Sequence, residues 1–598
     1  MTRVPSRLIL ILLTAAALAG GAASSQDPPS RRVILISFDG VADWIADKLI
    51  EEGKAPALGT VGRDGARADA MVSVIPTLTA VAHASMWTGA YPRDHGAVSN
   101  SMPRTPASAH TLLELQSGFL SGVLEAEPIW VTAARHGKRV LVAQATGGYP
   151  FTGPYPDRLT QFDAYGERLL ADELIEVRLG AEPHTFRIGD TDAEVRRSGE
   201  ASVLLRVGET EVTLGMRGLR HSPPLGVQAR GRRGHVRVLL LDLEPAGGRV
   251  LLSRGQARVI TSTHPELIDD LIAEAGVPIG EIHIGLYRRG RLGPTLAEGG
   301  TGEAERRFAD VVLANHEYFA GMARFASSRP WDLLVLYVSS MDTAGHALIG
   351  MLDPDTPGHD PALAARVWPV YERLFRITVD DYIADLRRRF PDAALVIGAD
   401  HGMEGTRRVW YPNALLREAG LLVEERGRPD LSRTKALFLY SDGGGIHLNS
   451  DRYREGIVAD AGRNAVKQAV ARALLSARDP LDGMPLVRSV VDPEVDGEAL
   501  GIGGDAAPDL FFDPTPGYET HARFGAPEIV ADGPPTGTGT HGQFPTRRRL
   551  HAIFYAAGPG IPAGTRPGLV RAVDVAPTAA RLLGIPPPPQ SVGHPVLD

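Results

Sequence analysis

The sequence predicts an α/β sandwich, because strand-like and helical segments alternate along most of its 598 residues. Several runs are continuously apolar and rich in β-branched residues, as expected for strands buried on both faces of a parallel sheet. These runs are 32–38, 139–143, 331–338, 393–397 and 551–555. Helical patterns lie between them, at 44–52, 304–326, 362–390 and 463–476.

One segment breaks this pattern. Residues 183–260 alternate polar and apolar side chains, with glycines between the runs, which is typical of an antiparallel β-structure. We therefore divide the chain into an N-terminal leader (1–25), a first core part (26–182), a β-rich insert (183–260) and a second core part (261–598). The insert either shapes a substrate entrance or packs as an appendage.

The N-terminus has the pattern of an export signal. Arg3 and Arg7 precede a short apolar run, Leu8 to Leu18, and the small residues around Ser25 suit cleavage. The run is shorter than the roughly 20 residues that a membrane span requires. The chain has no Cys, so it can form neither a disulfide nor a lipid anchor through Cys. We expect a periplasmic or secreted protein with no stable membrane anchor after cleavage.

The formal net charge is −8, with both signs well mixed along the chain. Nucleic-acid binding requires a concentrated basic surface, so we expect no nucleic-acid partner. The 67 Gly and 46 Pro are dispersed among apolar segments, which indicates many turns and not disorder.

Ionisable residues follow the predicted strands at their C-terminal ends, the edge at which open α/β sheets place their functional sites. Three are Asp and three are His: Asp39, Asp342, His346, Asp400, His401 and His541. Carboxylate oxygens and imidazole nitrogens together suit Zn²⁺. Two ions about 4 Å apart can clamp the attacking and leaving oxygens of a phosphoryl transfer.

Thr79 lies where a β-like run, 68–75, gives way to a predicted helix. A Thr at this junction is most often a helix N-cap. Its hydroxyl would also lie at a helix N-terminus, where unpaired N–H groups attract an anion. If the metal ligands converge on it, a bound ion would make Thr79 a nucleophile.

Taken together, these residues resemble those of the alkaline phosphatase superfamily, and most closely its type I phosphodiesterase/nucleotide pyrophosphatase branch. The similarity covers 33–100, 331–402 and 505–598. It implies an alkaline-phosphatase-like sandwich with a largely parallel central sheet, two Zn²⁺ ions and a covalent phospho-Thr79 intermediate.

The resemblance also implies a role for each residue. The first ion would be held by Asp342, His346 and His541. The second would be held by Asp39, Thr79, Asp400 and His401. Asn100 matches the family's Asn that binds a phosphate oxygen.

Two departures from the family bear on the substrate. Nucleotide pyrophosphatases usually carry an aromatic residue directly after the nucleophile, then Pro-Asn before the His, whereas this chain has Ala80, Val81 and Ala82 before His83. Thr-dependent phosphomonoesterases carry a Lys-x-Arg where this chain has the uncharged run 145–151. Fewer cations favour a diester, although Arg158, Arg407 or Arg408 could reach the site from loops. Tyr149, Phe151 and Tyr155 are either an aromatic wall beside the site or core aromatics.

We therefore expect an exported phosphodiesterase that acts on a small-molecule phosphoester. A phosphomonoesterase of the same superfamily remains the alternative. A sulfatase is less expected, because no Cys or Ser lies in a Cys/Ser-x-Pro-x-Arg setting. A non-catalytic module with structural zinc is also less expected, because structural sites usually have four protein ligands and often Cys.

Overall fold

A ten-stranded mixed sheet organises the chain. The computed structural model describes residues 31–151, 153, 155, 157–244, 248–280, 283–441 and 443–597, so the predicted leader lies outside the described residues. The strands of the sheet, in spatial order, are β13 (Leu225–Ala229), β14 (Arg232–Val236), β17 (Ala257–Ser262), β7 (Leu159–Leu170), β6 (Val140–Val142), β18 (Leu333–Val338), β1 (Arg32–Phe38), β19 (Ala393–Gly398), β31 (Phe554–Ala557) and β2 (Ala66–Arg67).

The centre of the sheet is parallel and its two flanks are antiparallel. β7, β6, β18, β1 and β19 all run in one direction. β31 and β2 on one flank, and β17, β14 and β13 on the other, pair antiparallel. In the register, Ile34 of β1 lies between Leu334 and Leu395. β18 and β19 are buried along their whole length, which explains their unbroken apolar sequences. The predicted fold class is confirmed.

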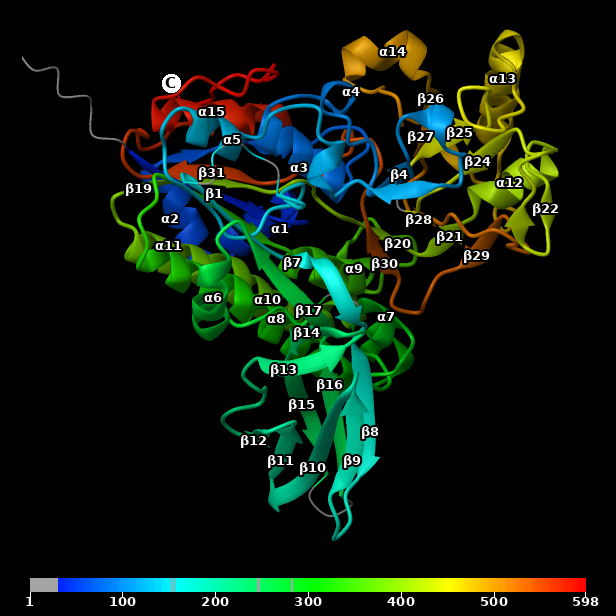
Figure 1. Ribbon diagram of the computed structural model, residues 1–598. Helices are drawn as coiled ribbons and strands as arrows, with labels where there is room; N and C mark the ends of the chain where they lie inside the picture. Colours follow the sequence, from blue (N-terminus) through cyan, green and yellow to red (C-terminus); the bar gives the residue numbers. More distant parts are fainter. Residues whose placement is uncertain are drawn as a thin grey trace, which may run out of the picture. The chain divides into compact units, whose positions relative to one another are not determined.

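Helices cover both faces of this sheet, as Figure 1 shows. α3 (Thr79–Thr88), α5 (Ile129–Arg135) and α15 (Val575–Leu583) contact one another on one face. The opposite face carries α2 (Pro56–Asp64), α8 (Glu303–Ser327), α9 (Ser340–Leu352), α10 (Pro361–Phe375) and α11 (Asp381–Arg389). The single helix predicted at 362–390 is thus α10 and α11, joined by a π-helical stretch at Arg376–Asp380.

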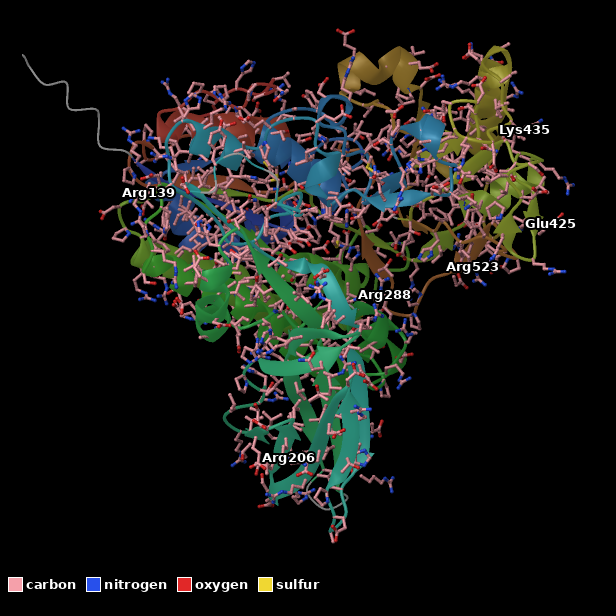
Figure 2. All side chains as sticks on the ribbon, viewed as in Figure 1. Arg139, Arg206, Arg288, Glu425, Lys435 and Arg523 are labelled. Carbon is pink, nitrogen blue, oxygen red and sulfur yellow. The ribbon has the colours of Figure 1, made fainter. Side chains whose placement is uncertain are left out.

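Two antiparallel sheets and a separate apolar core lie in and around the predicted insert at 183–260, whereas β13, β14 and β17 of that segment belong to the ten-stranded sheet. One sheet has the order β12 (Thr210–Gly215), β11 (Ser202–Val207), β10 (Thr191–Gly199), β9 (His184–Ile188); the other has β15 (Val238–Leu243), β16 (Arg249–Arg254), β8 (Glu173–Arg178). On the first sheet, Arg206 pairs with Glu194 at 2.7 Å (Figure 2). β7 and β17, which precede and follow these strands, belong to the central sheet, so the insert extends directly from it.

A second lobe packs around a separate apolar core that includes Trp410, Phe438 and Phe512. Its elements are β21 (Arg408–Trp410), α12 (Pro412–Glu418), β22 (Glu424–Glu425), β23 (Arg428–Pro429), β24 (Ala436–Phe438), β25 (Gly445–Leu448), α13 (Asp460–Ser476), β26 (Val487–Val491), α14 (Pro493–Leu500), β27 (Leu510–Pro514), β28 (Tyr518–Thr520) and β29 (Val530–Asp532). This lobe contains most of the chain between His401 and His541.

Short elements complete the described part of the chain. They are α1 (Asp43–Glu51), β3 (Ala70–Val72), α4 (Pro92–His95), β4 (Ser101–Pro103), β5 (Leu115–Ser117), α6 (Ile268–Ala275), α7 (His283–Arg288), β20 (Glu404–Thr406), β30 (Thr538–Thr540) and β32 (Leu569–Arg571). Among the residues that the structure describes, no helix is both long and apolar enough to cross a membrane.

Helix α9 crosses β30 at backbone contact distance. A Cβ added at Gly350 would lie 2.4 Å from the amide nitrogen of Thr538 and 2.6 Å from the carbonyl carbon of Gly537. Real Cβ atoms do not approach backbone this closely, so only glycine fits here. The close crossing brings Asp342 and His346, on α9, beside the residue that follows β30, His541.

This contact gives a stability prediction. Gly350→Ala forces α9 away from β30, and we expect a loss of about 1–3 kcal/mol in the free energy of unfolding, the usual cost of overpacking. The control is Gly462→Ala on α13, where the added Cβ meets nothing within 4 Å. There the loss of glycine entropy in the unfolded chain should stabilise the helix by about 0.5–1 kcal/mol. Urea unfolding of both variants measures the difference; equal midpoints would contradict the backbone contact.

Candidate active site

The carboxyl ends of the three central strands meet at one edge of the sheet and carry the predicted ligands there. Asp39 follows β1, Asp342 lies on the first turn of α9 after β18, and Asp400 and His401 follow β19. Gly40 adopts φ +70°, and a Cβ there would lie 2.8 Å from the Cα of Asp342. The loop after β1 can therefore touch the start of α9, which brings Asp39 and Asp342 to the same place.

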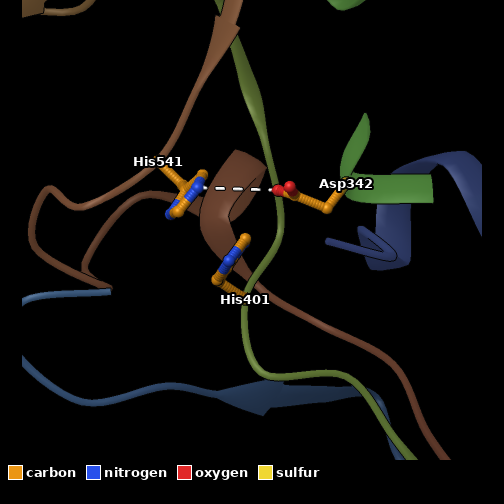
Figure 3. A group of neighbouring side chains, drawn as sticks. All are labelled: Asp342, His401 and His541. Carbon is orange, nitrogen blue, oxygen red and sulfur yellow. Dashed lines mark ion pairs between the residues drawn. The ribbon is translucent and has the colours of Figure 1, made fainter. Parts of the chain in front are cut away.

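The first group of ligands is Asp342, His346 and His541. Nε2 of His346 lies 3.4 Å from Oδ1 of Asp342, and Nε2 of His541 lies 3.6 Å from the same oxygen. Figure 3 shows the second of these contacts, with the rings of His401 and His541 nearly parallel beside it. Those two rings stack at 3.6 Å between centroids, so the first group is continuous with the second.

The second group converges on one nitrogen, Nε2 of His401. Oδ2 of Asp400 lies 3.2 Å from it, Oδ1 of Asp39 lies 3.3 Å from it, and the hydroxyl oxygen of Thr79 lies 3.4 Å from it. Asp400 and His401 are fully buried and Asp39 is 2% exposed. The structure thus brings together residues that are separated by more than three hundred positions in the chain.

Backbone carbonyls orient all three histidines in the same way. Nδ1 of His346 lies 2.8 Å from the carbonyl oxygen of Gly539, Nδ1 of His541 lies 2.8 Å from that of Thr77, and Nδ1 of His401 lies 2.9 Å from that of Gly402. A carbonyl only accepts, so each Nδ1 carries the proton. Each Nε2 therefore presents its lone pair to the site, as in metal-binding histidines.

This donor set fits two zinc ions. Four ligands held tetrahedrally at about 2.0–2.1 Å from Zn²⁺ lie about 3.3 Å from one another, close to the separations found in both groups. Oδ1 of Asp39 and Oδ2 of Asp400 are buried and lie 3.3 and 3.2 Å from Nε2 of His401. Two buried carboxylates this close together require positive charge beside them, which a bound cation would supply.

The pKa values reflect this crowding of charge. Burial lowers the pKa of His401, but Asp400 and Asp39 outweigh it and raise the value to about 10. Burial raises the pKa of Asp39, but its contacts with His401 and the charge of His83 bring it below its ordinary value. Burial, with the neighbouring His401 and His346, holds the pKa of His541 well below its ordinary value. The carboxylates thus strongly favour positive charge in this cluster.

Thr79 is the first residue of α3 and does not cap it. Leu78 occupies the N-cap position, and no side-chain hydrogen bond caps the helix there. The Thr79 hydroxyl is directed at His401 instead, and the residue is 7% exposed. The capping interpretation of this Thr is therefore wrong, and its hydroxyl lies among the predicted ligands.

Asn100 takes over part of the capping of α3. Its Oδ1 accepts a hydrogen bond of 2.8 Å from the backbone N–H of Ala80, and its Nδ2 donates one of 3.0 Å to the hydroxyl of Tyr440. Asn100 thus lies at the helix N-terminus that carries Thr79, as a phosphate-binding residue would.

A cavity of about 480 Å³ opens onto these residues. Asp39, Thr79, Asn100, Asp342, His346 and His541 line it, whereas Asp400 and His401 lie deeper. Most of the remaining lining residues are polar or aromatic: Ser117, Phe119, Gln144, Thr146, Tyr149, Asp163, Tyr165, Tyr337 and Tyr440, with Leu120, Ala145 and Gly166 beside them. None of these described lining residues is Lys or Arg.

Of the aromatic and arginine residues considered from the sequence as candidates near the site, only some lie beside the cavity. Tyr149 lines the cavity, and the ring of Phe151 makes an edge-to-face contact with the ring of Tyr149 at 5.5 Å between centroids. Tyr155 packs against the main core instead. Arg158 and Arg407 bond backbone carbonyls elsewhere, and Arg408 pairs with Asp479 and Asp482; none of the three lines the cavity.

Three residues near the site were not assigned from the sequence. The hydroxyl of Tyr337 donates a 2.6 Å hydrogen bond to Oδ2 of Asp39, and Tyr440 accepts from Asn100. Arg288, labelled in Figure 2, donates a 2.7 Å hydrogen bond to the carbonyl of His346. Tyr337 lies within the apolar run of β18, so the sequence alone suggests an ordinary core residue. Tyr440 and Arg288 do not lie in a recognisable motif.

His83 is the fourth such residue and is fully buried. Its Nδ1 lies 2.9 Å from the carbonyl of Thr79 and 3.2 Å from Oδ2 of Asp400, while Nε2 lies 2.8 Å from the hydroxyl of Ser37. Asp39, His83 and Asp400 are close enough to be considered a metal site. Because Nδ1 bonds a carbonyl it carries a proton, so it cannot be a ligand; His83 supports Asp400 from behind.

Comparison with known proteins places this site in a family. The family model described as type I phosphodiesterase / nucleotide pyrophosphatase matches residues 33–201 and 255–543. The unmatched stretch between them covers β11 to β16 of the insert.

Curated relatives match over shorter stretches. Human ectonucleotide pyrophosphatase/phosphodiesterase family member 7 is 33% identical over 112 residues, which is 18% of this chain and 23% of that protein. Human family member 1 is 28% identical over 145 residues, which is 23% of this chain and 15% of that protein. The chain therefore matches about a quarter or less of the length of these relatives.

Solved structures of similar proteins cover nearly the whole chain. Human ectonucleotide pyrophosphatase/phosphodiesterase 5 has a TM-score of 0.45 and 16% identity, over 93% of this chain and 95% of its own. The murine protein, solved in complex with AMP, has a TM-score of 0.46 and 16% identity, over 94% of this chain and 96% of its own.

The family model matches both core parts and spans every predicted ligand from Asp39 to His541. The chain belongs to the type I phosphodiesterase/nucleotide pyrophosphatase family.

Proposed function

We propose that this chain is a metal-dependent hydrolase of small-molecule phosphodiesters, with Thr79 as the nucleophile. The observation that carries the proposal is the position of the Thr79 hydroxyl. It lies at the N-terminus of α3, 3.4 Å from Nε2 of His401, and Thr79 lines a cavity together with five of the other predicted residues. A hydroxyl among buried metal ligands and at a helix N-terminus is suited to attack an anionic ester.

The proposal divides the predicted ligands between two ion sites. Asp342, His346 and His541 would hold the first zinc, and Asp39, Thr79, Asp400 and His401 would hold the second. Two zinc ions bound there supply Lewis acidity, which lowers the pKa of the Thr79 hydroxyl and neutralises charge on the attacking and leaving oxygens.

In the first step the Thr79 hydroxyl loses its proton to solvent and its oxygen attacks phosphorus. The bond to the leaving group breaks, phospho-Thr79 forms, and the leaving alkoxide takes up a proton from solvent to become the alcohol. The side-chain amide of Asn100 donates a hydrogen bond to a phosphoryl oxygen. In the second step water attacks phospho-Thr79, which releases the product and restores the hydroxyl. Two in-line displacements retain the configuration at phosphorus.

The cavity favours a diester over a monoester. A monoester carries an additional negative charge, and none of the described residues that line the cavity supplies a Lys or Arg to meet it. A phosphomonoesterase is therefore the second candidate. A sulfatase or a non-catalytic zinc-binding module has no observation in its favour.

Export is part of the proposal and is supported by the sequence of residues 1–25 alone. The basic, apolar and small-residue segments follow one another there as in a signal peptide. We place the mature protein in the periplasm or outside the cell.

A rate comparison tests the proposed function. Zinc-loaded protein is assayed with bis(p-nitrophenyl) phosphate, p-nitrophenyl phosphate and p-nitrophenyl sulfate. We expect the highest kcat/KM for the diester, because no Lys or Arg among the described lining residues meets the extra negative charge of the monoester. A higher kcat/KM for the monoester would reverse the assignment, and zinc-bound protein without any esterase activity would support a binding module.

Replacing Thr79 tests the nucleophile. Thr79→Ala removes the attacking oxygen, and we expect kcat to fall by on the order of 10³-fold or more. Six of the seven ligand residues remain, so zinc measured by mass spectrometry should stay bound. Thr79→Ser retains the oxygen and is the matched control that should keep measurable turnover. Wild-type turnover by Thr79→Ala would contradict the role of Thr79.

His83 gives a further prediction as a positioning residue. It joins the carbonyl of Thr79 to Oδ2 of Asp400, so it orients both the nucleophile and a ligand. His83→Leu removes this donor at similar volume, and we expect a loss of about 10–100-fold in activity or zinc affinity, as is usual for residues behind metal ligands. His83→Asn places an amide N–H where Nδ1 lies and should recover most of the loss. Equal activity and zinc retention in His83→Leu and the wild type would show that His83 is only a core residue.

A further inference from the structure

The amide of Asn100 is held at both ends by two different parts of the chain. Oδ1 accepts from the backbone N–H of Ala80 at 2.8 Å, and Nδ2 donates to the hydroxyl of Tyr440 at 3.0 Å. A backbone N–H only donates, so Oδ1 must face α3 and Nδ2 must face Tyr440. The orientation of the amide is therefore determined by these two contacts.

Nδ2 carries two hydrogens, and the Tyr440 hydroxyl accepts one of them. Asn100, Thr79 and Tyr440 line the same cavity. The second N–H of Asn100 is thus left to donate to a ligand in the cavity that Thr79 also lines. The neutral amide can donate there without adding a charge to the site.

Tyr440 comes from the second lobe and not from the central sheet. It follows β24 and precedes β25, and it is half-buried. Asn413 clamps the end of β24, because its side chain exchanges hydrogen bonds of 2.8 and 2.9 Å with the backbone of Phe438. Next to Tyr440, the Ser441 hydroxyl accepts a 3.0 Å hydrogen bond from the amide of Ala522. The loop that carries Tyr440 is therefore anchored to the lobe on both sides.

We propose that Tyr440 is a positioning residue that holds the amide of Asn100 toward the substrate phosphate. The second lobe thereby completes the phosphate-binding part of the site. This inference rests on the proposed function, since it assigns Tyr440 a role in the reaction at Thr79. Without the Tyr440 hydroxyl, the amide is anchored only at Oδ1, and Nδ2 loses the contact that sets its direction.

The test is a double-mutant cycle with bis(p-nitrophenyl) phosphate. Tyr440→Phe removes the hydroxyl and keeps the ring; we expect kcat/KM to fall about 5–20-fold, the effect of one well-placed hydrogen bond. Asn100→Ala should lower it about 100-fold, as loss of an oxyanion donor does. Because Tyr440 acts through Asn100, the double variant should be no slower than Asn100→Ala alone.

Tyr453→Phe is the matched control. Tyr453 lies in the same lobe and accepts a 3.1 Å hydrogen bond from Arg452, but it does not line the cavity. We expect wild-type kcat/KM for this variant, whatever it does to the melting temperature. Zinc content and melting temperature are measured for every variant, so that a loss through unfolding is separated from a loss in the reaction.

Two results would overturn the inference. One is wild-type kcat/KM in Tyr440→Phe. The other is a double variant in which the two losses multiply, because Tyr440 would then act independently of Asn100. A wild-type protein that hydrolyses no ester would instead contradict the proposed function itself, so the two failures are distinguishable.

Discussion

The convergence of acceptors on Nε2 of His401 is the interaction on which the rest of the site depends. Oxygens of Asp39, Asp400 and Thr79 all lie 3.2–3.4 Å from it in a buried place. Isolated buried carboxylates cost several kcal/mol each unless cations compensate them. Burial of the apolar side chains of β1, β18 and β19 offsets the free-energy cost of this cluster in the folded protein. A bound ion would lower that cost and raise the free energy of unfolding.

Close backbone packing converts the sheet into a site. The parallel register of the central strands brings their ends to one edge, but it does not by itself bring Asp342 next to Asp39 or His541. Those contacts need the turn at Gly40 and the crossing of α9 over β30 at Gly350. Both glycines therefore act on geometry at a distance from the reacting atoms, and larger residues there would separate the two groups of ligands.

Most of this architecture could be predicted from the sequence, because the central strands are unbroken apolar runs and Asp39, Asp342 and Asp400 directly follow them. The edges were less predictable: the run at 551–555 is a strand only at Phe554–Ala557, since Ala552 bridges Met71 instead. His83 and Tyr440 could not be predicted, because their roles depend on contacts with residues far away in sequence. His83 reads as an ordinary core histidine, and Tyr440 lies in the part of the chain with the weakest motif.

The proposed site draws on more than one part of the chain. Asp39, Asp342, Asp400 and His401, which are predicted ligands, lie where the central strands end. The cavity wall extends beyond these strand ends: Gln144 follows β6, Asp163 lies on β7, and Tyr440 belongs to the second lobe. The second lobe is built around its own apolar core, so Tyr440 reaches the site from a part of the chain that packs separately from the central sheet. If Tyr440 positions Asn100 as proposed, the reaction at the sheet edge depends on how this lobe packs beside it.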